Sequence, residues 1–118
     1  MAEARIDSPP NKEVNVKEGS DAELSCVVDM GSGIEEITIA AFWYLDGQPI
    51  DCQFQTGFIC TKEIRGHRLI STLVIVKAAL HHAGNFTCSI PYAKPDTVTL
   101  HVLDGKAFKL LKVSPRRY

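Results

Sequence analysis

Apolar and polar residues alternate along much of the chain. In DAELSCVV the apolar residues occupy every second position, and the same repeat recurs in NFTCSI and TVTLHVL. A repeat of two is typical of strands that bury one face. The three segments therefore predict strands with these inward residues: Ala22, Leu24, Cys26 and Val28; Phe86, Cys88 and Ile90; Val98, Leu100 and Val102.

Two further segments extend this pattern. ITIAAFWYL (37–45) places Ile37, Ile39, Ala41, Trp43 and Leu45 on one face, and RLISTLVIV (68–76) does so for Leu73 and Ile75. Turn residues separate the runs, including the hairpin signal Asp46-Gly47 and a glycine at position 66. Seven to nine short strands with turns between them predict an all-β, antiparallel sandwich.

Composition narrows the class of protein. The chain has 118 residues, enough for one domain, with 45% apolar and 23% charged residues. Its formal net charge of −1 gives no basic surface for nucleic acid. The apolar runs are too short to cross a membrane. Residues 1–5 contain no apolar signal core, so we expect a cytosolic chain or a fragment without its signal peptide.

The four cysteines suggest an oxidising environment. An even number in a short chain favours two disulfides, although four free thiols or a zinc site are alternatives. No C-x-x-C pair supports zinc. Cys52 and Cys60 flank Gly57, so a hairpin that turns at this glycine is predicted to bring them within bonding distance. Free thiols, or a bond to another chain, remain the alternatives for this pair.

The order of several residues resembles the immunoglobulin superfamily. The matching residues are Cys26, Trp43, Leu73, Ile75, Gly84, Phe86 and Cys88, within residues 6–104. The resemblance implies a Greek-key immunoglobulin sandwich in which Cys26 and Cys88 bridge the sheets and Trp43 packs on the bridge. Trp43, Leu73, Ile75 and Phe86 are then core residues. Residues 1–5 are predicted to be a leading segment, and residues 105–118 a basic tail or linker.

The segment HHAGNFTC (81–88) matches the corner motif D-x-G-x-Y-x-C of that superfamily, with two differences. His82 replaces the aspartate, and Phe86 replaces the tyrosine. We therefore expect a corner held by packing rather than by the usual polar contacts, with His81, His82 and His101 at the surface. Because Cys88 is expected to be oxidised, we predict neither a catalytic site nor a metal or cofactor site here.

A closer resemblance comes from two stretches, FWYLDGQPI and STLVIVKAALHHAGNFTCSIPYAKPDTVTLHVLDGK. They are similar to the second, membrane-proximal immunoglobulin domain of the insect defective proboscis extension response (Dpr) receptors. This resemblance implies a cell-surface recognition and adhesion module that acts in synapse organisation on the extracellular side of the neuronal plasma membrane. The implied partners are other immunoglobulin-superfamily surface proteins or a second copy, with membrane attachment through parts outside this chain.

Two alternatives to this function are a secreted immunoglobulin-fold binding protein and an intracellular structural module of the kind found in muscle filaments. Two surface features bear on the choice. Asn85-Phe86-Thr87 is an N-glycosylation sequon whose Asn85 is predicted to point outward. Phe42, Tyr44, Thr99 and His101 are predicted to share the outer face of one sheet as a candidate interface. Local packing of the two aromatic rings is the alternative.

Overall fold

The structure is a computed structural model that describes residues 2–31, 40–52 and 56–105. Its strands are β1 (Ala2–Glu3), β2 (Arg5–Ile6), β3 (Glu13–Lys17), β4 (Ala22–Asp29), β5 (Phe42–Leu45), β6 (Gln48–Pro49), β7 (Phe58–Arg65), β8 (Arg68–Ile75), β9 (Gly84–Ser89), β10 (Ala93–Lys94) and β11 (Asp96–Leu103). A short 3-10 helix, η3 (Leu80–His82), precedes β9. No helix among these residues is long and apolar enough to span a membrane.

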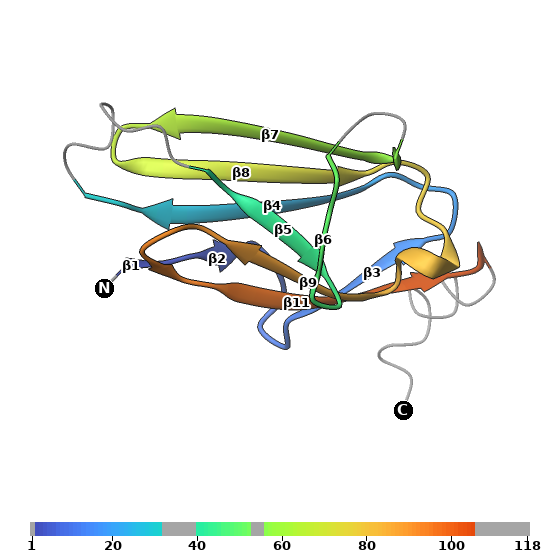
Figure 1. Ribbon diagram of the computed structural model, residues 1–118. Helices are drawn as coiled ribbons and strands as arrows, with labels where there is room; N and C mark the ends of the chain where they lie inside the picture. Colours follow the sequence, from blue (N-terminus) through green and yellow to red (C-terminus); the bar gives the residue numbers. More distant parts are fainter. Residues whose placement is uncertain (1, 32–39, 53–55, 106–118) are drawn as a thin grey trace.

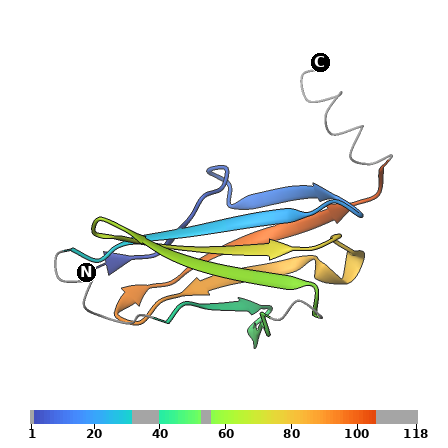
Figure 2. The same cartoon turned by 90° about the horizontal axis from the view of Figure 1, so that it is seen from above.

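Two sheets form the sandwich (Figures 1 and 2). One has the strand order β2-β4-β8-β7 and the other the order β3-β11-β9-β5-β6, while β1 and β10 form a separate two-stranded ladder. β4 pairs with β8, and β5 pairs with β9, so neighbours in each sheet come from distant parts of the sequence, as in a Greek key. The arrangement confirms the predicted all-β immunoglobulin-like sandwich.

The apolar positions of the predicted alternation lie on the buried face of each sheet. Leu24 pairs with Leu73 across β4 and β8, and Trp43 pairs with Cys88 across β5 and β9. The core contains Leu24, Cys26, Val28, Trp43, Leu69, Leu73, Ile75, Phe86, Cys88, Ile90, Val98 and Leu100, all at most 2% exposed. Ile37 and Ile39, predicted to be inward in the same strand as Trp43, lie outside the described residues.

Two strand pairs depart from the purely antiparallel prediction. β3 runs parallel to β11, and β1 runs parallel to β10. For β3 the cause is a change of sheet: β2 belongs to the four-stranded sheet, and the chain then crosses to the five-stranded sheet and continues as β3. Ala4, before the predicted start of the domain at residue 6, is buried in the core. That boundary stays a prediction.

The predicted β5–β6 hairpin has the expected backbone. Asp46 and Gly47 both have positive φ angles, 50° and 81°, which is the type I′ arrangement favoured between right-twisted strands. The Asp46 carboxylate then lies against the first residue of β9. A Cβ placed on Gly84, whose φ is +152°, would be only 2.7 Å from Asp46 Oδ2. Glycine at position 84 therefore allows this close approach.

Candidate recognition surface

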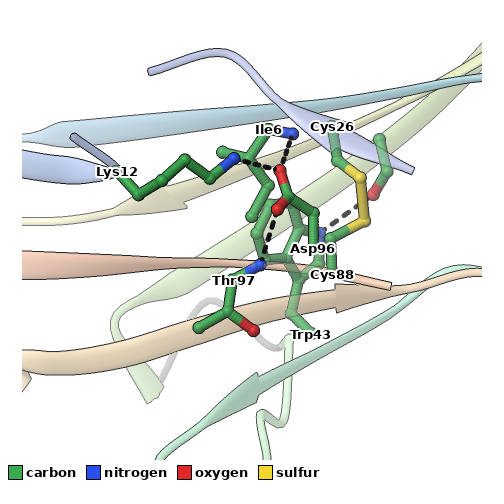
Figure 3. The surroundings of a disulfide bond; sticks show 8 residues. Ile6, Lys12, Cys26, Trp43, Cys88, Asp96 and Thr97 are labelled. Atoms are coloured by element: carbon green, nitrogen blue, oxygen red, sulfur yellow. Dashed lines mark hydrogen bonds and ion pairs between the residues drawn. A yellow bond between two sulfur atoms is a disulfide. The ribbon is translucent and has the colours of Figure 1, made fainter. Parts of the chain in front are cut away.

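All four cysteines form disulfides: one bond joins the two sheets, and the other lies at the edge of the sandwich. Cys26 on β4 bonds to Cys88 on β9, and the indole of Trp43 lies beside the bond (Figure 3). Trp43 Nε1 donates a hydrogen bond of 3.0 Å to Ser71 Oγ, so the buried indole nitrogen is satisfied. Cys52 bonds to Cys60.

The second disulfide differs from the predicted hairpin. Cys52 lies beyond the end of β6, and Cys60 lies on β7 of the other sheet. Gly57 does occupy the turn before β7, with φ +84°, and residues 53–55 between Cys52 and this turn lie outside the described residues. The bond therefore closes the open edge of the sandwich between β6 and β7.

The outer face of the five-stranded sheet carries an uncharged patch. Phe42 pairs with Ser89, Tyr44 pairs with Thr87, and Thr87 pairs in turn with Thr97. Phe42 is 50% exposed, whereas Tyr44 is half-buried. We name these residues the aromatic patch: Phe42, Tyr44, Thr87, Ser89 and Thr97.

The other predicted interface residues lie on the same face but have partners within the domain. Thr99 Oγ1 donates to Asn85 Oδ1 at 2.8 Å. His101 Nε2 lies 2.7 Å from Glu13 Oε1 on the neighbouring strand β3. The structure thus gathers the predicted residues on one face, with the exposed aromatic ring at one end and hydrogen-bonded polar groups at the other.

Asn85, the acceptor residue of the sequon, is exposed on this face. Its backbone N–H donates to Asp46 Oδ1 at 2.8 Å, which fixes the strand at this position. Thr87, the third residue of the sequon, shares a hydroxyl hydrogen bond of 2.8 Å with Thr97. The modification of Asn85 stays a prediction.

The prediction that His82 lies at the surface is wrong. His82 is 7% exposed, and its Nδ1 accepts a 2.9 Å hydrogen bond from the backbone N–H of Ala79. Its ring meets Phe58 edge-on at 5.4 Å. Burial, followed by the nearby ring of His81, lowers the pKa of His82. The corner is therefore held by a polar contact as well as by packing, because the imidazole caps η3 from within.

Asp96 is a structural residue that the sequence did not reveal. Its Oδ2 accepts hydrogen bonds from the backbone N–H of Ile6 at 2.8 Å and from Lys12 Nζ at 2.6 Å. Its Oδ1 accepts a bond of 3.0 Å from the backbone N–H of Thr97 (Figure 3). The carboxylate thus ties β11 to the segment that crosses between the sheets. A turn motif, AKPD, was the only local signal.

The described residues contain no group of three or more side chains placed to hold a metal ion. The rings of His81 and His82 lie 4.2 Å apart and are tilted by 47° to each other, but the sulfur of Cys88 is bonded to Cys26. The histidines and the cysteine of HHAGNFTC therefore do not combine as a nucleophile with its base.

Comparisons with known proteins bear on the fold of the chain rather than on its function. No protein-family model matches the chain, and no curated protein matches it. A chain in the crystal structure of Dpr2 Ig1-Ig2 in complex with DIP-Theta Ig1-Ig3 is similar, with a TM-score of 0.75 and 24% identity over 87% of this chain. The match spans 50% of that chain, so this protein covers about half its length.

Other similar structures come from different settings. The ZIG-8 IG1 homodimer gives a TM-score of 0.58 and 20% identity, covering 79% of each chain. Titin domain I10 gives a TM-score of 0.59 and 18% identity, covering 77% of this chain and 89% of that one. Identities this low show the fold alone. The chain therefore has the immunoglobulin fold, in a form similar to domains of Dpr2, ZIG-8 and titin.

Proposed function

We propose that the chain is an extracellular recognition module of a cell-surface receptor, of the kind that the Dpr resemblance implies. Two of the similar structures are complexes of immunoglobulin domains: one is a Dpr2–DIP-Theta complex and the other a ZIG-8 homodimer. By analogy, the proposed partner is an immunoglobulin domain of another surface protein or of a second copy. The neuronal and synaptic setting belongs to this proposal. The proposed function is binding alone and involves no chemical step.

The observation that carries the proposal is the aromatic patch. Phe42 exposes half of its surface on the outer face of the sheet, and the patch around it has hydroxyl side chains rather than charges. Interfaces are enriched in aromatic residues, and their cores are depleted in charge. The aromatic patch therefore has the composition of a protein–protein interface whose centre is small and uncharged.

The disulfides support an extracellular location. Two bonds that use every cysteine suit an oxidising compartment. We place the domain on the outer side of the plasma membrane, attached through parts outside this sequence. The runner-up is an intracellular structural module, for which the similarity to titin is the supporting observation. Such a module has no need of a second disulfide.

Replacing Phe42 with serine tests the proposal. The wild-type chain is measured by sedimentation for self-association and by surface binding against a panel of immunoglobulin-superfamily ectodomains. Ile64→Ser is the matched control, because Ile64 is 41% exposed on β7 of the other sheet. Loss of an interface anchor costs about 1.4 kcal/mol or more, so we expect Phe42→Ser to weaken binding at least about tenfold.

Ile64→Ser is expected to leave the affinity unchanged. Equal weakening by both variants would overturn the assignment of the aromatic patch. The absence of both self-association and panel binding would overturn the recognition proposal in favour of the structural module.

A further inference from the structure

A cleft of about 400 Å³ lies on the outer face of the four-stranded sheet, where β2, β4 and β8 are neighbours. Ser25 and Val27 on β4 form its floor, because the disulfide-bonded Cys26 between them points into the core. Arg5 on β2 and Arg68 on β8 lie on either side of this floor. The other lining residues are Ile6, Asp7 and Ser8.

The two arginines of the cleft can reach one ligand from opposite sides. Arg5 pairs with Val27, and Val27 pairs with Ile70, which lies two residues from Arg68 along β8. Two strand spacings across the sheet and two residues along a strand separate the Cα atoms of the arginines by roughly 12 Å. Their guanidinium groups, at the ends of long side chains, can therefore converge above Val27.

These guanidinium groups differ from others in the domain in having no acidic partner. In the described part of the chain, no carboxylate lies within ion-pair distance of Arg5 or Arg68. Asp29 is the cross-strand neighbour of Arg68, but its Oδ1 accepts a backbone N–H at 3.1 Å. By contrast, Arg65 Nε on the same sheet donates to Glu63 Oε2 at 3.3 Å. Planar guanidinium groups bind sulfate or carboxylate through two parallel hydrogen bonds, so this pair suits an anionic group.

The remaining polar groups narrow the class of ligand. The Ser25 side chain is half-buried on the floor of the cleft and offers a hydroxyl. Asp7 is exposed at the edge of the cleft, and its backbone N–H donates a 2.9 Å hydrogen bond to the Ser25 carbonyl. The Asp7 carboxylate repels a ligand that is acidic throughout, but it accepts hydrogen bonds from hydroxyl groups. The cleft therefore favours a ligand that has hydroxyl groups beside its anionic group.

We propose that this cleft binds an acidic saccharide, a sugar unit that carries a sulfate or carboxylate group. The anionic group lies between Arg5 and Arg68, and the sugar hydroxyls contact Asp7 and Ser25. The volume of about 400 Å³ is within the usual range for small-molecule sites, roughly 300–1,000 Å³. The cleft and the aromatic patch lie on opposite sheets, so the inference stands apart from the recognition function.

Nuclear magnetic resonance titration of the full chain tests the site through the amide signals of Ile6, Ser25 and Val27. A heparin-derived disaccharide, which carries sulfate and carboxylate groups, is expected to shift these signals in a saturable manner. A hyaluronan disaccharide, which carries carboxylate alone, separates the two sources of charge: binding of both assigns the anion site to carboxylate, and binding of the first alone assigns it to sulfate. Replacing Arg5 or Arg68 with glutamine removes charge-assisted hydrogen bonds, so each variant should weaken binding at least about tenfold.

Lys77→Gln is the matched control, because it removes the same charge from an exposed side chain just beyond the other end of β8. It is expected to leave the affinity unchanged. Phe42→Ser should also leave it unchanged, so a failure of the recognition proposal and a failure of this one are separate results. Asp7→Asn should lower the affinity for the heparin-derived disaccharide more than that for inorganic sulfate, because only the saccharide brings hydroxyl groups.

Several outcomes would overturn the proposal. Cleft signals that do not shift, or shifts confined to the basic residues 106–118, would show that the saccharide binds elsewhere or not at all. Equal weakening by Lys77→Gln would mean a general attraction between charges. Equal affinity for inorganic sulfate and the disaccharide, or an equal loss of both in Asp7→Asn, would remove the sugar from the site. Tighter binding of a tetraglutamate peptide would assign the cleft to an acidic segment of a protein.

Discussion

The Asp96 carboxylate accepts hydrogen bonds from three donors, and replacing Asp96 with alanine removes all three bonds. Ile6 is 2% exposed, so its N–H loses a charge-assisted hydrogen bond where water has poor access. Thr97 is exposed, and water replaces its bond at little cost. Lys12 is 42% exposed at the side chain, and an ion pair this open contributes less than about 1 kcal/mol. Together these terms predict a loss of about 2–3 kcal/mol.

Asparagine at position 96 keeps one oxygen but not the charge. Its amide nitrogen must face either the Thr97 N–H or the pair of donors from Ile6 and Lys12, so we expect a loss of about 1–2 kcal/mol. Urea unfolding should therefore rank the losses as Asp96→Ala, then Asp96→Asn, then Lys12→Ala. Equal losses for Lys12→Ala and Asp96→Ala would refute the reasoning, because the ion pair would then dominate the backbone bonds.

Acid titration provides a second check on Asp96. Burial alone would raise the pKa of this carboxyl, but hydrogen bonds from Lys12, Ile6 and Thr97 and the charge of Lys12 lower it below its usual value. A folded pKa below the unfolded value of about 3.9 means that the stabilisation is complete above that pH. The difference in stability between wild type and Asp96→Asn should therefore shrink as the pH falls from 5 to 2.

Two further predictions concern the corner and the sequon. The folded pKa of His82 lies below the unfolded value of about 6.5, so its neutral form stabilises the fold above that pH and stability falls as the pH is lowered through it. In urea unfolding, His82→Asn, which keeps an acceptor for the N–H of Ala79, should lose less stability than the wild type between pH 7 and pH 5. An equal loss of stability in both proteins would contradict this prediction. Expression through a secretory pathway should add a glycosidase-sensitive mass that Asn85→Gln abolishes, whereas an unmodified wild-type mass would contradict the sequon prediction.

The sheets and their buried faces follow from local patterns in the sequence. A repeat of two marks Leu24 and Cys26 as inward, and Leu73 across the sheet shows the same repeat. The frame of cysteines and tryptophan then orders the strands into an immunoglobulin sandwich. These features were predictable because each depends on neighbouring residues or on a motif with fixed roles.

The contacts that the sequence did not predict depend on residues far apart in the chain or on backbone geometry. Asp96 meets Ile6 across 90 positions and Lys12 across 84. His82 turns inward because the N–H of Ala79 points at its ring, and alternation in the sequence carries no information about that angle. Likewise, the Cys52–Cys60 bond joins the chain just after the β5–β6 hairpin to β7, which belongs to the other sheet.

The Cys26–Cys88 bond also sets how the domain responds to a pulling force. Its two cysteines are 62 positions apart, so the loop between them cannot be drawn out while the bond is intact. Among the described residues, only the 41 that lie before Cys26 and after Cys88 are then free to extend, by at most roughly 140 Å. Among these residues, β3 and β11 lie side by side in parallel, so tension between the chain ends loads their hydrogen bonds along the strands. A domain built this way acts as a short, stiff tether.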